Sequence, residues 1–179
     1  MPRVTEKDAD CRVYTFKEGL LSAVAHDLEI RVERFSLEWD EARTRIEASW
    51  DPTSLRVLNA MKDGAPNPSA LSERDKAKIE SNIQDEVLEV KRFGAIRFVS
   101  NSIASEGDGF RVRGTLELHG RAREIDARVV REGDRVATDV VLEQPEFGIT
   151  PYRAMMGTLR IKPEVRVRIS MPARLWEDA

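Results

Sequence analysis

Two histidines, His26 and His119, are the side chains of this sequence best suited to proton transfer near neutral pH. His119 continues the polar parity of the alternating segment 110–118 and is followed by Gly120, so we expect its ring to point outward and brace a turn. His26 shares its parity with the apolar residues that follow it and is expected to face inward. There it could hydrogen-bond the polar head of an apolar ligand, or act with Asp27 as an acid–base pair.

A second candidate site is the segment 144–162, whose apolar residues do not follow a plain strand pattern. Tyr152 offers a hydroxyl that could bind a polar group or take part in catalysis. The flexible side chains of Met155 and Met156 adapt to irregular apolar ligands. Together with Phe147, these residues either line the mouth of a cavity or plug a core.

Other catalytic signatures are missing from the sequence. The single cysteine, Cys11, excludes an intramolecular disulfide and has no base beside it, so we interpret it as a small strand residue. No CxxC, HxH or HExxH spacing predicts a metal site, and there is no phosphate-binding loop or GxSxG elbow. We therefore expect no metal, no cofactor and no catalytic residue.

Alternation of apolar and polar residues with a period of two predicts that β-strands carry these groups. The clearest examples are 110–118 and 159–171, with weaker ones at 12–17, 26–39, 44–50, 95–103, 123–131 and 135–143. Short connections favour antiparallel pairing. About eight strands, each apolar on one face, must form a sandwich or a closed barrel, and the barrel is favoured because closure removes exposed edges.

Two features interrupt the strand pattern. An amphipathic helix is predicted at about 72–90, where apolar residues recur at helical spacing after a start signal formed by Ser72 and Asp75. We expect it to pack at the barrel and close one end. Within 26–39 the apolar parity changes near Glu33, which requires a bulge or bend.

Gly114 lies on the inward parity of its strand, between larger apolar neighbours. We expect its missing side chain to leave room for a ligand chain, and Ala48 and Ala127 to contribute further space.

Length and composition favour a single domain over 1–179. The net charge is -3, and acids and bases are interleaved, which argues against nucleic-acid binding. The charged start lacks the apolar core of a signal peptide, and no window resembles a transmembrane segment. With one cysteine as well, the expected location is cytoplasmic.

The order of motifs resembles the YceI-like family of lipid-binding proteins over roughly residues 11–173. The features that carry the resemblance are His26 in "AHDLEIRVERF", "DPTSL" at 51–55, Arg74 before "GAIRFVSNSI", the Gly114, Leu116, His119 and Gly120 signature, and Phe147 with Gly148. The resemblance implies a lipocalin-like, extended eight-stranded antiparallel barrel with a long tunnel. It further implies binding of a polyisoprenoid, an isoprenoid quinone or a fatty-acid derivative, often in a homodimer.

The leading hypothesis is non-enzymatic binding of such an apolar or amphiphilic small molecule, as carrier or scavenger. Two alternatives stay open: a small-molecule enzyme that uses His26 with Asp27, or Tyr152, at the barrel mouth, and a packed barrel that mediates protein interactions. The expected ligand-binding residues are His26, Leu28, Ile30, Phe110, Val112, Gly114, Leu116, Phe147, Tyr152, Met155, Met156 and Leu159.

Overall fold

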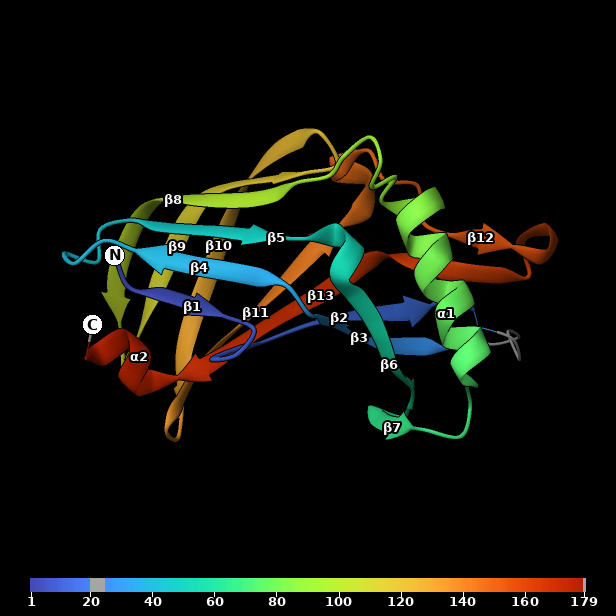
Figure 1. Ribbon diagram of the computed structural model, residues 1–179, viewed down its shortest axis with the longest axis horizontal. Helices are drawn as coiled ribbons and strands as arrows, with labels where there is room; N and C mark the ends of the chain where they lie inside the picture. The colour runs from blue at the N-terminus through green and yellow to red at the C-terminus, as the bar shows by residue number, and fades with distance from the viewer. Residues whose placement is uncertain (20–24, 179) are drawn as a thin grey trace.

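A computed structural model describes residues 1–19 and 25–178 of the chain, and it is built mainly of antiparallel strands (Figure 1). The strands are β1 (Arg3–Thr5), β2 (Asp10–Lys17), β3 (Asp27–Val32), β4 (Phe35–Trp39), β5 (Ile46–Trp50), β6 (Leu55–Lys62), β7 (Ala65–Asn67), β8 (Ile96–Glu106), β9 (Gly109–Leu118), β10 (Arg121–Glu132), β11 (Arg135–Glu143), β12 (Arg153–Ala154) and β13 (Leu159–Pro172). The helical elements are η1 (Pro52–Ser54), α1 (Glu73–Asn82), η2 (Ile83–Val87), η3 (Gln144–Phe147), η4 (Met155–Gly157) and α2 (Ala173–Glu177).

Within the described residues, twelve strands form one hydrogen-bonded order: β1-β4-β5-β8-β9-β10-β11-β13-β2-β3-β6-β7. β12 pairs only with β13, outside this order. The strands β3 and β4 lie near opposite ends of the order yet are joined directly through Glu33 and Arg34. The sheet therefore curls into a half-barrel around one interior, with β1 and β7 as its edges.

The expected closed barrel of eight strands is wrong in two respects: the hydrogen-bonded order contains twelve strands among the described residues, and it does not close. Three long segments, residues 3–17, 27–39 and 46–62, are each broken by a bend or loop into two strands, and β7 adds a further edge strand. The ring is completed by the covalent β3–β4 connection, because the edge strands do not pair with each other in the part of the chain that the structure describes. The prediction of an all-β antiparallel fold with one amphipathic helix is confirmed.

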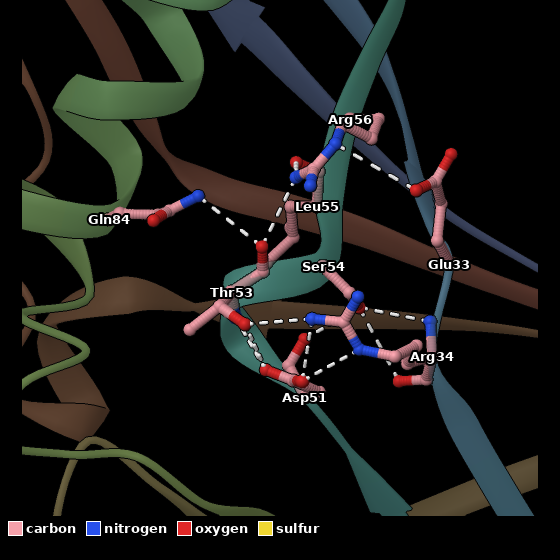
Figure 2. Close-up of polar contacts among 8 residues, drawn as sticks. All are labelled: Glu33, Arg34, Asp51, Thr53, Ser54, Leu55, Arg56 and Gln84. Atoms are coloured by element: carbon pink, nitrogen blue, oxygen red, sulfur yellow. Dashed lines mark hydrogen bonds and ion pairs between the residues drawn. The ribbon is translucent and has the colours of Figure 1, made fainter.

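The bend predicted near Glu33 is present, and it is bonded to a second bend between β5 and β6 (Figure 2). Ser54 is fully buried. Its hydroxyl accepts a hydrogen bond from the Arg34 backbone N–H (3.0 Å) and donates one to the Asp51 carbonyl (2.7 Å). The Asp51 carboxylate accepts from the Thr53 backbone N–H (2.8 Å) and from Arg34 Nε (2.9 Å). At the two bends some backbone groups lose their inter-strand hydrogen bonds, and side-chain oxygens bond to these groups instead.

The charge on Asp51 is favoured by these contacts. Partial burial opposes ionisation, but hydrogen bonds from the Thr53 hydroxyl and backbone, together with Arg34, outweigh it and hold the pKa of Asp51 below its usual range. The group therefore stabilises the bend above its ordinary pKa, and this stabilisation is lost as the pH falls through the lowered folded-state value.

Replacing Ser54 with alanine is expected to lower the free energy of unfolding by about 1–3 kcal/mol, because the Arg34 backbone N–H and the Asp51 carbonyl both lose their hydrogen bonds to the buried Ser54 hydroxyl. Urea denaturation measures the change. Ser49→Ala is the matched control, since the exposed Ser49 hydroxyl bonds to the Ser36 hydroxyl rather than to a backbone group among the described residues, and we expect its effect to stay within about 0.5 kcal/mol. Equal effects of both substitutions would show that the bend does not depend on Ser54.

The helix α1 begins as predicted. The Ser72 hydroxyl accepts from the Asp75 backbone N–H (3.1 Å), and the Asp75 carboxylate accepts from the Ser72 N–H (2.9 Å). The helix was expected at about 72–90. In the structure α1 continues directly as the π-helical η2, and the helical segment ends at Val87. Ile79 and Ile83 pack against the core, so the helix lies across one end of the half-barrel, while α2 lies at the other (Figure 1).

No helix in the described residues is long and apolar enough to cross a bilayer.

Candidate functional site: two adjoining chambers

The half-barrel encloses a cavity of about 310 Å³, called here the inner chamber. Apolar side chains form nearly all of its wall and come from strands all around the curl. They include Val13, Ile30, Ala48, Phe98, Val112 and Ala127. The volume lies at the lower end of the range typical of small-molecule sites.

Aromatic side chains cover the α2 end of the inner chamber. The rings of Phe110 and Trp176 stack with their centroids 4.4 Å apart, and Trp39 tilts against Trp176 at 5.3 Å. The third tryptophan of the chain, Trp50, also lines the chamber. All three indoles therefore contact the same cavity.

A second pocket of about 480 Å³, called here the outer chamber, adjoins the inner one beneath α1. Thr15, Ile83, Val87 and Gln144 line both chambers, so these residues form the junction. The outer wall mixes apolar residues with polar ones: His26, Asp75, Lys78, Asn82 and Tyr152. An apolar compartment thus shares part of its wall with a mixed one.

Several polar groups of the outer chamber are held in place. The Tyr152 hydroxyl accepts from Asn82 Nδ2 at 2.9 Å, which ties the segment before β12 to α1. Hydrogen bonds from the Ser72 hydroxyl and backbone lower the pKa of Asp75, and the nearby Arg74 and His26 favour its charge further. Asp75 is therefore an anion at neutral pH, in the same wall as His26 and Lys78.

Two buried polar atoms of the inner chamber, Thr15 Oγ1 and Trp39 Nε1, have no hydrogen-bond partner among the described residues. Buried polar groups are nearly always paired, so each such atom calls for an explanation. Thr15 is the most informative, because it stands at the junction of the two chambers. A hydroxyl there can hydrogen-bond an occupant.

The lone cysteine also lines the inner chamber. Burial raises the pKa of the Cys11 thiol to about 12, and the nearby Trp50 indole N–H opposes this rise only in part. The thiol is consequently neutral at physiological pH and contributes a small apolar surface, in agreement with its interpretation as a strand residue.

The residues expected to bind ligand divide between the two chambers. Those in the inner wall are Ile30, Phe110, Val112, Leu116 and Phe147. Those in the outer wall are His26, Leu28, Tyr152 and Leu159. Gly114, Met155 and Met156 lie in neither wall.

The space that Gly114 was expected to leave is filled. A Cβ at this position would lie 2.3 Å from the Val99 carbonyl oxygen and 2.7 Å from the Phe98 ring. The pairing of β8 with β9 shifts register between Ser100 and Ser102, directly opposite Gly114, and this bulge brings the β8 backbone close. The glycine permits close approach of two strands rather than passage of a ligand.

The two methionines were expected at a cavity mouth, and this too is corrected. Met155 and Met156 form the turn between β12 and β13 and are 60% and 105% exposed. Both have positive φ angles, 51° and 58°, which turn the chain back on itself at the hairpin tip. Their side chains consequently project into solvent.

His119 braces a turn, as expected, but its ring is not exposed. The side chain is 8% accessible, its Nε2 lies 2.9 Å from Glu89 Oε2, and its Nδ1 lies 3.2 Å from the Phe147 carbonyl. The ring also packs on Phe93, with centroids 4.2 Å apart. A left-handed backbone at His119 (φ 52°) ends the outward direction of the strand and folds the ring beneath these neighbours.

The expected acid–base pair of His26 with Asp27 is not brought together around one chamber. The Asp27 carboxylate accepts from the Lys17 backbone N–H at 2.8 Å and is absent from both walls, whereas His26 lines the outer chamber. No cluster of three or more potential metal-ligating side chains occurs in the described part of the chain.

Thr15 and the polar residues of α1 were not recognised from the sequence. Thr15 shares the parity of Cys11 and Val13, so a polar residue on the inward face of a strand was the available signal. Asn82 and Lys78 gave no such signal, because a polar helix face is ordinarily solvated.

Comparisons with known proteins agree on the fold. The family model of the YceI-like domain matches residues 14–173. BcnA of Burkholderia cenocepacia is similar in structure, with a TM-score of 0.61 and 15% identity over 91% of this chain and 94% of that one. A polyisoprenoid-binding domain from Saccharophagus degradans, implicated in plant cell wall breakdown, has a TM-score of 0.59 and 12% identity over 96% and 99% of the two chains. No curated protein matches the sequence.

Proposed function

The chain belongs to the YceI-like domain family, and from this premise we propose that it binds an amphiphilic lipid without catalysing a reaction. The ligand is a polyisoprenoid, an isoprenoid quinone or a fatty-acid derivative, and the protein acts as its carrier or scavenger. Its apolar tail occupies the inner chamber and its polar head lies in the outer chamber.

The observation that carries this proposal is that an apolar chamber and a mixed chamber lie side by side and share four wall residues. A buried methylene contributes up to about 0.8 kcal/mol, so a tail in the inner chamber supplies the affinity. The polar residues beneath α1 offer hydrogen bonds to the head. The relative from Saccharophagus degradans, described as polyisoprenoid-binding, supports the same ligand class.

The alternatives are less favoured. Catalysis by His26 with Asp27 needs both groups at one reacting atom, and the Asp27 carboxylate is bonded to the backbone of β2 instead. A packed barrel is disfavoured by the inner chamber of about 310 Å³.

Extraction with organic solvent followed by mass spectrometry tests the proposal on the purified protein, and titration with a two-isoprene menaquinone tests it directly. Quinones quench indole fluorescence, and all three tryptophans line the inner chamber, so bound quinone should quench most of the emission. Geranylgeraniol and palmitate are then added as competitors. If no lipid co-purifies with the protein and it takes up none of the three probes, the protein does not have this function.

Thr15→Val is expected to change stability and affinity in opposite directions. Removing the unpartnered hydroxyl should raise the free energy of unfolding of the empty protein by about 1 kcal/mol. It should also weaken geranylgeraniol binding about fivefold, because the prenyl alcohol loses a hydrogen bond at the junction. Fluorescence titration and urea denaturation measure the two effects.

Thr15→Ser, which keeps the hydroxyl, is the matched control and should bind as the wild type does. A hydrocarbon ligand such as squalene should not distinguish the variants. If Thr15→Val and Thr15→Ser bind geranylgeraniol equally well, the head does not lie at this junction.

A further inference from the structure

The β12–β13 hairpin projects from the molecule (Figure 1), and the two adjacent methionines at its tip, Met155 and Met156, are exposed to solvent. Four large hydrophobic side chains are strongly exposed in the described residues: Met1, Val141, Met155 and Met156. Single exposed apolar residues are ordinary on a protein surface, but Met155 and Met156 are neighbours at a projecting turn. This pair is the feature to explain.

The backbone holds both methionines outward at a conformational cost. A left-handed φ costs roughly 1–2 kcal/mol for a residue other than glycine, and both Met155 and Met156 adopt one. The turn is fixed by hydrogen bonds to the Met155 carbonyl from the Thr158 hydroxyl (2.7 Å) and backbone N–H (3.2 Å). Strain of this kind is often retained where a surface has a function.

Positive charge lies directly behind the pair. Arg153 and Arg160 are cross-strand partners, both are exposed, and neither forms an ion pair with a carboxylate in the described part of the chain. Like charges in directly opposed positions destabilise a hairpin. The tip is thus apolar and cationic, although the whole chain has a net charge of -3.

The base of the same hairpin belongs to the site. Tyr152, just before β12, and Leu159, at the start of β13, both line the outer chamber. The methionine turn therefore projects from the wall of that chamber, and a surface that seats the tip lies next to the chamber.

We propose that this tip docks on an anionic lipid bilayer. Met155 and Met156 insert among the acyl chains near the surface, and Arg153 and Arg160 contact the lipid phosphates. Two apolar residues are far too small for a stable protein interface, which buries about 800 Å² on each side. A few apolar groups combined with basic residues are, in contrast, the pattern of a weak membrane anchor. Transfer of a lipid from the bilayer into the outer chamber rests on the proposed function, whereas docking does not.

Sedimentation with phosphatidylcholine vesicles, with and without phosphatidylglycerol, tests docking. The wild type should bind the anionic vesicles more strongly, and added salt should weaken this binding. Met155→Ser with Met156→Ser should lower partitioning at least about tenfold. Arg153→Gln with Arg160→Gln should lower it about 30-fold on anionic vesicles only, at about 1 kcal/mol for each arginine.

Val141→Ser is the control variant, because Val141 is also exposed (56%) but lies on β11, outside the hairpin tip, and lines neither chamber. It should partition as the wild type does. Docking by the tip is contradicted if the wild type ignores anionic vesicles, if the tip variants bind as well as the control, or if light scattering shows that the tip instead joins two copies of the chain.

Menaquinone delivered by two routes separates this proposal from the binding function. Added from ethanol, it should quench the tryptophans of the tip variants as in the wild type. When menaquinone is supplied in anionic vesicles, it should quench the tryptophans of the tip variants at least about tenfold more slowly than those of the wild type. Failure of uptake by both routes with intact vesicle binding would overturn the proposed function and leave docking supported; equal rates from vesicles would overturn the tip's role.

Discussion

Ala127→Phe is expected to abolish lipid binding, with a loss of affinity of at least about 100-fold. Ala127 is buried on β10 and faces the inner chamber. A phenyl ring there occupies the space that the tail needs, and each displaced methylene removes up to about 0.8 kcal/mol. The empty variant should keep its fold, because the ring enters a cavity and buries apolar area rather than displacing packed atoms.

Ala122→Phe provides the matched control on the same strand. Ala122 lies on the opposite face of β10 and is exposed, so its replacement by phenylalanine adds the same ring outside the chamber. Titration with geranylgeraniol and urea denaturation are run on both variants, with Ala127→Leu as a smaller obstruction of intermediate effect. Wild-type affinity in a folded Ala127→Phe protein would place the lipid outside the inner chamber.

Gly114→Ala is expected to lower the free energy of unfolding by about 3 kcal/mol or more, the largest stability effect that we predict for a single methyl group. The new Cβ would lie 2.3 Å from the Val99 carbonyl oxygen, a backbone atom that cannot move without breaking the β8–β9 pairing. Urea denaturation with a far-UV circular dichroism signal measures the loss.

Gly133→Ala separates packing from backbone conformation. Gly133 has a left-handed φ of 64° and no atom near the site of a Cβ, so its replacement should cost only about 1–2 kcal/mol. If Gly114→Ala were as stable as the wild type but bound lipid less well, the glycine would be making room for ligand, as the sequence first suggested.

Strand positions were predictable wherever alternation was unbroken. The segments 110–118 and 159–171 lie within β9 and β13, and the change of parity at Glu33 marked a real bend. β6 was not predicted, because a register shift opposite Glu29 and Ile30 puts its buried residues Val57 and Ala60 on different parities. A bulge removes the periodic signal on which such predictions depend.

The site was predictable only in its apolar part. Inward parity correctly placed Ile30, Val112 and Leu116 in the wall of a chamber. It could not show that the β8 backbone fills the space over Gly114, because that contact arises from a neighbouring strand's bulge. Nor could it separate Tyr152, which lines the outer chamber, from Met155 three residues later, because a left-handed turn reverses the chain between β12 and β13.

The aromatic rings of Trp39, Phe110 and Trp176 cover the α2 end of the inner chamber, so under the proposed function a lipid enters from the α1 side. A lipid in a bilayer meets a docked protein with its headgroup leading, whereas a blind apolar compartment admits the tail first. If the chain takes lipid from a bilayer as proposed, the lipid must reverse its orientation on entry, and the larger outer chamber, with its mixed wall, has room for that reversal. Delivery of the lipid to a membrane would require the same reversal in the opposite direction.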